Sequence, residues 1–103
     1  MSWRTLRIDG VSRIWREVAR FTVEPVHDDL PMGFRIKILE DQEGHFMGCP
    51  EIAIRDAQGT PDWVSGIGHS TEEALTDTVK ALLGTLHDKP KIEADTIWWD
   101  QRF

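Results

Sequence analysis

The side chains best suited to bind a metal ion are those of four histidines and a single cysteine. A zinc site needs three or four ligands, which usually come in close pairs such as Cys-x2-Cys or His-x3-His. No histidine stands at such a spacing, and His45 with Cys49 is an isolated i, i+4 pair in a turn-rich stretch. We therefore predict no metal site and no cofactor from this set, which is His27, His45, His69, His87 and Cys49.

Hydroxyl and carboxyl groups around His69 suggest a second kind of chemistry. Ser70 and Thr71 follow that histidine directly. A nucleophile needs a base within about 3 Å, held by a third group, and adjacency in sequence does not supply this geometry. The pair Glu72 and Glu73 has no spacing signature either, and no phosphate-binding glycine motif is present. We predict that the chain is not an enzyme and has no catalytic residues.

These hydroxyls and carboxylates are better explained as the start of a helix within GIGHSTEEALTDTVKALL, residues 66–83. Ser70 is a preferred N-cap, and Glu73 is placed to complete a capping box. Acidic groups in the first turn occupy the positive helix end and would repel a phosphate. We expect the helix to end near His87, because Pro90 cannot continue it. The predicted core stripe is Leu75, Val79, Leu82, Leu83 and Leu86, and the predicted solvent face is Glu72, Glu73, Thr76, Asp77 and Lys80.

Three antiparallel strands are predicted between residues 33 and 68, ahead of this helix. Phe34, Ile36 and Ile38 alternate with charged residues, which is typical of a strand with one wet face. EDQEG and DAQGTPD are turns. Pro50 interrupts the second strand at an edge or a bulge, because proline cannot donate to a ladder. The third strand is predicted to contain Trp63, Val64 and Ile67.

The segment SRIWREVARF, residues 12–21, fits two patterns. As a helix it places its arginines on one face. As a strand it alternates, but Glu17 and Val18 then lie on the wrong faces. We favour the helix. The whole chain is thus predicted to be one α+β domain, residues 1–103, with a three- to four-stranded antiparallel sheet, one long amphipathic helix packed on one face, and a short N-terminal helix or strand.

The distribution of charge along the chain bears on whether the protein binds nucleic acid. The net charge is −6, yet residues 1–24 carry +2, with five arginines against three acids, so the remainder carries −8. Nucleic-acid binding draws most of its affinity from a basic surplus. The candidate nucleic-acid surface is therefore confined to this first segment, at Arg13, Arg16 and Arg20. The other interpretation is that the segment docks on the acidic remainder.

A single cysteine excludes an intramolecular disulfide, and no apolar run approaches the roughly 18 residues of a membrane span. The N-terminus lacks a secretory signal, so a cytoplasmic location is expected. Five tryptophans are a surplus for 103 residues. Trp98 and Trp99 are neighbours on a predicted last strand, so their side chains point to opposite faces: one can be core, and the other is covered, for example by Trp3, or exposed. Tryptophan is enriched at interfaces. The candidate partner-binding residues are Trp98, Trp99, Glu72 and Asp77.

Two short motifs carry family resemblances. PEI at 50–52 and GHSTEEAL at 68–75 resemble the HicB family of antitoxins, which implies three strands followed by a helix. Gly66, Gly68 and Ser70 also resemble the last-helix motif of the double-stranded RNA-binding domain, which implies an α-β-β-β-α order if residues 12–21 are helical. Thr71 and Glu72 stand where that family has phosphate-contacting lysines, so the resemblance implies shape without RNA contact.

From these observations we expect a small non-catalytic protein-binding module of the antitoxin, immunity-protein or inhibitor type. Its acidic surface would be steered towards a basic partner protein. One alternative is an RNA- or DNA-binding domain that uses the basic first segment. The other is a homo-oligomeric structural subunit, such as a homodimer joined by sheet edges or by the Trp98 and Trp99 tail.

Overall fold

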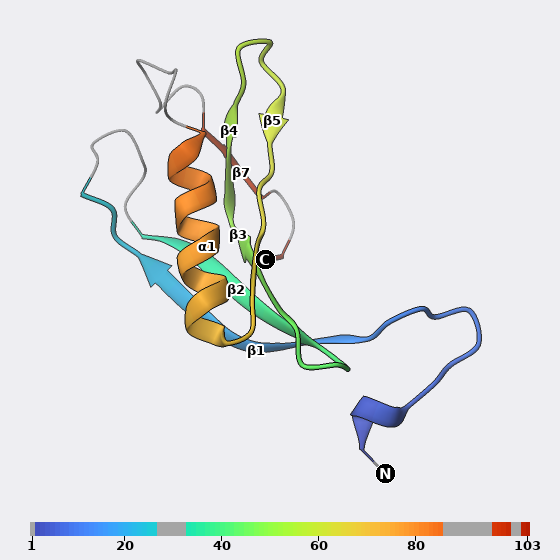
Figure 1. Cartoon of the computed structure of the whole chain (residues 1–103). Helices are drawn as coiled ribbons and strands as arrows, with labels where there is room; N and C mark the ends of the chain where they lie inside the picture. Colours follow the sequence, from blue (N-terminus) through green and yellow to red (C-terminus); the bar gives the residue numbers. More distant parts are fainter. Residues whose placement is uncertain (1, 27–32, 86–95, 100–101) are drawn as a thin grey trace.

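In a computed structural model of the chain, residues 2–26, 33–85, 96–99 and 102–103 are described. They form two antiparallel sheets with one helix packed against them, which confirms the predicted α+β class (Figure 1). The larger sheet has the order β1-β2-β3-β6 and the smaller one the order β5-β4-β7. The elements are η1 (Trp3–Thr5), β1 (Trp15–Val23), β2 (Phe34–Asp41), β3 (Phe46–Pro50), β4 (Ile52–Arg55), β5 (Pro61–Asp62), β6 (Gly66–Gly68), α1 (Thr71–Gly84) and β7 (Thr96–Trp98).

Strand β2 forms the centre of the larger sheet. Its alternation is confirmed, because Phe34, Ile36 and Ile38 are buried while Arg35 and Lys37 reach the other face. Burial of each large apolar side chain contributes about 1.5–3 kcal/mol, so this strand and its covering helix dominate the stability. The buried apolar cluster is Phe34, Ile36, Ile38, Ile52, Ile54, Ala74 and Leu82.

The predicted second strand is divided between the two sheets. β3 pairs with β2 and β6, whereas β4 pairs with β5 and β7. The break falls at Glu51, directly after Pro50, so the predicted interruption is confirmed. Glu51 joins the sheets, because its backbone N–H donates to Arg35 O and its carbonyl accepts from Trp99 N, both at 2.8 Å. The predicted third strand is divided in the same way, and Trp63 and Val64 lie between β5 and β6.

The predicted helix over residues 12–21 is wrong, because most of that segment belongs to strand β1. The register of β1 against β2 shifts between Glu17 and Ala19, so Val18 is the extra residue of a β-bulge. The bulge resets the alternation. Ala19 and Phe21 pack against the core, whereas Val18 is 37% exposed. The alternation of inward and outward side chains is therefore interrupted at Val18, which is why a helical pattern fitted the sequence better.

Helix α1 begins where the sequence predicts. Ser70 is the N-cap, and its Oγ accepts a hydrogen bond from Glu73 N at 3.1 Å. The helix ends at Gly84 rather than near His87, because Thr85 caps it by donating from its backbone N–H and its hydroxyl to Leu82 O. His87 itself, like Leu86 of the predicted stripe, lies outside the described residues.

The face that α1 buries is centred on smaller residues than predicted. Ala74 and Thr78 are fully buried, whereas Leu75 and Val79 of the predicted stripe are partly buried. The reason lies in the facing strands, where glycines let the helix approach closely. A Cβ added at Gly48 would overlap Thr78 Oγ1 and lie 3.1 Å from Ala74 O. Close packing of backbones therefore replaces large side chains at this contact.

Replacing the helix cap is expected to weaken α1. Ser70→Ala removes the acceptor for Glu73 N and should lower the free energy of unfolding by about 1 kcal/mol. Urea unfolding followed by circular dichroism measures the change. Ser70→Asp keeps an acceptor at the cap and is the control that should stay close to wild type. Equal losses in both variants would contradict a capping role.

Candidate functional site

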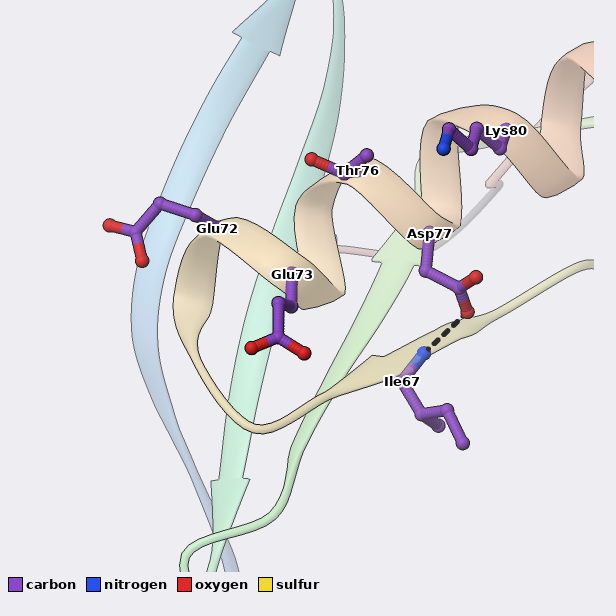
Figure 2. Close-up of a pocket in the computed structure, with 6 residues that line it drawn as sticks. All are labelled: Ile67, Glu72, Glu73, Thr76, Asp77 and Lys80. Carbon is purple, nitrogen blue, oxygen red and sulfur yellow. Dashed lines mark hydrogen bonds between the residues drawn. The ribbon is translucent and has the colours of Figure 1, made fainter.

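An acidic hollow lies between helix α1 and the edge strand β6 (Figure 2). It is open to solvent and has a volume of about 360 Å³. Carboxylates line it on the helix side, and on the strand side lies an aliphatic residue, Ile67, that is 71% exposed. We call this surface the acidic hollow and define it by Ile67, Glu72, Glu73, Thr76, Asp77 and Lys80.

Two local features place the lining of the acidic hollow. Glu73 and Asp77 are four residues apart, so they lie on the same side of α1. Gly66 and Gly68 press β6 against the helix, because a Cβ at Gly68 would lie 2.7 Å from Ala74 N. Ile67, between these glycines, projects away from the helix (Figure 2).

A hydrogen bond fixes the edge strand to the helix. Ile67 N–H points away from β3 and donates to Asp77 Oδ2 at 2.9 Å (Figure 2). An outward N–H on an edge strand is otherwise free to pair with another chain. Because Asp77 occupies this N–H, another strand cannot pair with it. A partner would therefore contact side chains at this edge rather than the Ile67 N–H.

The arginines of the β1–β2 face lie near carboxylates, whereas the carboxylates of α1 have no ion-pair partner among the described residues. Glu40 accepts from Arg4 at 2.6 Å and from Arg16 at 3.3 Å, and Arg35 meets Glu51 at 2.6 Å. These partners lower the pKa of the Glu40 and Glu51 carboxyls. By contrast, within the described ranges no cation lies in ion-pair contact with a carboxylate of the acidic hollow.

The predicted nucleic-acid-binding arginines do not share a helical face. Arg13 precedes β1, and Arg16 and Arg20 lie on it. Each is near a carboxylate: Arg13 is 3.8 Å from Asp41, Arg16 is 3.3 Å from Glu40, and Arg20 is 2.7 Å from Glu17. Their guanidinium groups also lie over aromatic rings, those of Trp15, Trp3 and Phe103 respectively. For Arg13 and Arg16 this arrangement fits the interpretation that the basic segment docks on the acidic remainder, whereas Arg20 pairs with Glu17 within the segment.

We accordingly expect the chain not to bind duplex RNA. A phosphate backbone would have to compete with carboxylates already within 4 Å of all three arginines. A fluorescence titration with duplex RNA at several salt concentrations measures this. Binding at low salt with a steep negative salt slope would contradict the expectation, because that slope is produced by counterion release.

The two C-terminal tryptophans are both exposed, so neither takes the core position that was open to one of them. Trp98 is 45% and Trp99 42% exposed. β7 is an edge strand, and its partner β4 supplies the buried side chains of the smaller sheet. Trp99 is covered in part by Trp63 and Phe103, with ring centroids at 5.3 and 6.2 Å, and not by Trp3. Neither tryptophan lines the acidic hollow, so the structure unites only Glu72 and Asp77 among the four predicted partner-binding residues.

A second hollow of about 460 Å³ adjoins the first, because Ile67 and Glu73 line both. The rings of His45 and His69 also line it, with centroids 6.4 Å apart. His45 Nδ1 lies 3.1 Å from Asp41 Oδ2. Within the part of the chain that the structure describes, no three His, Cys, Asp or Glu side chains are grouped to hold a metal ion. His27 and His87 lie outside the described residues.

Cys49, the predicted neighbour of His45, lies on β3 opposite Lys37. Burial raises the pKa of its thiol, which makes it a weak nucleophile at neutral pH. The sequence pattern placed Ile67 in the third strand and did not single it out as a surface residue of the site. The signal that identifies it is the pair of flanking glycines, Gly66 and Gly68.

Comparison with known proteins gives no match. This holds for family models, for curated proteins and for solved structures. The resemblances to HicB antitoxins and to the double-stranded RNA-binding domain therefore stay predictions, and β1 occupies most of the segment that the second one needs as a helix. Within the described ranges, no helix has the length and apolar character to cross a membrane.

Proposed function

We propose that this chain is a small protein-binding module of the antitoxin, immunity-protein or inhibitor type, which neutralises a basic partner protein through the acidic hollow. The observation that carries the proposal is the charge asymmetry of the surface. The arginines of the β1–β2 face are near carboxylates, whereas Glu72 and Glu73 stand without an ion-pair partner among the described residues. This leaves one face of α1 with net negative charge.

Ile67 gives the acidic hollow an apolar edge on the strand side. Protein interfaces commonly combine a desolvated anchor with a polar rim that excludes water and sets orientation. Here the exposed isoleucine is the anchor, and Glu72, Glu73 and Asp77 are the rim. Lysine or arginine side chains on the partner would meet the rim, and an apolar side chain would meet Ile67. Steering by the net charge of −6 would speed association with such a basic protein.

The order of elements is compatible with the HicB-like resemblance. Antiparallel strands β1, β2, β3 and β6 precede a capped helix, and the motif residues 68–75 lie at the start of that helix. Within residues 33–86 the structure has five strands, β2 to β6, ahead of the helix, because the second and third strands that the resemblance implies are each divided in two. The residues of the motif thereby form part of the acidic hollow, since Glu72 and Glu73 line it.

Affinity capture from native lysate tests the proposal. The wild-type chain is expected to retain a basic protein that E72Q/E73Q/D77N does not retain. These substitutions remove three charges yet keep the acceptor oxygen for Ile67 N and the helix-forming side chains. D9N/E24Q/D62N removes three charges elsewhere on the exposed surface and is the matched control, which should still retain the same protein. Equal retention by both triple variants would overturn the proposal.

A further inference from the structure

The N-terminal arm, residues 2–14, is joined to the rest of the chain mainly at its far end. It leaves the sheet ahead of β1, loops away and returns with η1 beside the β2–β3 turn (Figure 1). Arg4 Nη2 lies 2.6 Å from Glu40 Oε2. Gln42 Nε2 donates to the carbonyl oxygens of Trp3 at 2.8 Å and Leu6 at 2.7 Å. The Trp3 ring lies 4.8 Å from the Arg16 guanidinium.

The segment between this anchor and β1 is a linker with local contacts only. Among the described residues, residues 7–12 form no hydrogen bond or ion pair with the sheets or the helix. The linker turns at Gly10, which has a φ of +85°, and Val11 N donates to Ile8 O at 3.0 Å. All of its residues are exposed, including the apolar side chains of Ile8 and Val11.

The surface that receives the arm belongs to the sheet and does not depend on the linker. Glu40 and Gln42 stand at the end of β2, and Arg16 stands opposite Glu40 on β1. Glu40 is nearly buried, so loss of Arg4 would leave a buried carboxylate with one cation fewer. This receiving surface therefore requires an arm, but its contacts would be identical whichever copy of the chain supplied that arm.

We propose that two copies of this chain exchange their N-terminal arms and form a homodimer. Each Arg4 then pairs with Glu40 of the other copy, and each Gln42 holds the backbone of the other arm. Because exchange conserves these contacts, the cost of association must be offset by new ones. Leu6, Ile8 and Val11 provide them, since the two linkers would run side by side across the two-fold axis and bury side chains that are exposed in one copy.

Charge exchange between separate variants tests the arm directly. R4E places like charges at Glu40, and E40R places like charges at Arg4 and Arg16, so each variant alone should be monomeric by light scattering. An equal mixture should form a 1:1 heterodimer, because the R4E arm is complementary to the E40R sheet and the remaining pair is native. Wild-type chain should show a dimer fraction that rises between about 1 and 500 µM. Wild-type chain that stays monomeric over this range, or a mixture without heterodimer, would overturn the proposal.

A second variant avoids the risk that E40R fails to fold. Deletion of Asp9 and Gly10 removes the turn and keeps Ile8 and Val11 for the dimer contact, so the shortened arm cannot fold back onto its own sheet but can still reach a second copy. It should be dimeric at every concentration, and a monomer would contradict exchange. The inference is independent of the proposed function: E72Q/E73Q/D77N should leave the dimer unchanged, and the monomeric R4E should still capture the basic partner.

Discussion

Gly48→Ala and Gly66→Ala are each expected to lower the free energy of unfolding by about 1–3 kcal/mol, because they overpack the contact between α1 and the sheet. A Cβ at Gly48 overlaps the Thr78 side chain. A Cβ at Gly66 overlaps the Thr78 backbone nitrogen and lies 2.7 Å from the Asp77 carbonyl carbon. Chemical denaturation of each purified variant measures the loss.

The two glycines are distinguished by what each Cβ would meet. Thr78→Ala removes the hydroxyl that blocks Gly48, so G48A/T78A should recover part of the stability lost in G48A. The same background should rescue Gly66→Ala less, because Thr78→Ala removes the hydroxyl at 2.5 Å but leaves the backbone obstructions, Thr78 N and the Asp77 carbonyl carbon at 2.7 Å. Thr78→Ala alone supplies the reference for both double variants. Equal rescue at both positions would contradict the packing described for α1.

Asp41→Ala is the second substitution with a large expected effect, a loss of about 1–3 kcal/mol through orphaned hydrogen-bond donors. The Asp41 carboxylate is fully buried, and its Oδ1 accepts from the backbone N–H groups of Glu43 and His45, both at 2.9 Å. It also meets His45 Nδ1 at 3.1 Å. Asp41→Asn keeps one acceptor oxygen and should lose less. Thermal unfolding at neutral pH separates the two variants, and equal loss would contradict this role.

The same carboxylate makes the protein acid-sensitive. Burial raises the pKa of Asp41, but the backbone N–H groups of His45 and Glu43 outweigh burial, so the net pKa is lowered. A lowered folded pKa adds stability above the unfolded pKa, near 4, and that stability is lost as the pH falls through the folded value. Glu40 and Glu51 act in the same direction through their arginine partners. Asp41→Asn should therefore reduce, without abolishing, the fall in melting temperature on acidification.

The sequence predicted the elements whose signals are local. Ser70 as N-cap, the alternation of β2, the two turns and the break after Pro50 all depend on neighbours within a few residues, and the structure confirms them. Strand β1 was missed because a bulge at Val18 interrupts its period, and a bulge is visible only in the pairing with β2. The buried helix face was misjudged for a similar reason, since Thr78 is buried by glycines that lie far away in the sequence.

The candidate site was only partly predictable. Glu72 and Asp77 were identified from the helical pattern, and the structure places both in the acidic hollow. Ile67 and Glu73 complete it, but their juxtaposition depends on how β6 packs against α1, which periodicity does not reveal. The tryptophan pair suggested an interface on side-chain type alone, and its place at the end of β7 and directly after it separates the pair from the acidic residues.

We propose that the acidic hollow binds a basic protein. The most direct test is the dissociation constant of the purified complex with the captured partner, measured by calorimetry for wild type, E72Q/E73Q/D77N and D9N/E24Q/D62N. We expect the dissociation constant to rise by about tenfold or more for the first triple variant and by less than about twofold for the second. Equal dissociation constants for the two triple variants would contradict binding at the acidic hollow, because both variants change the net charge by the same amount but at different places.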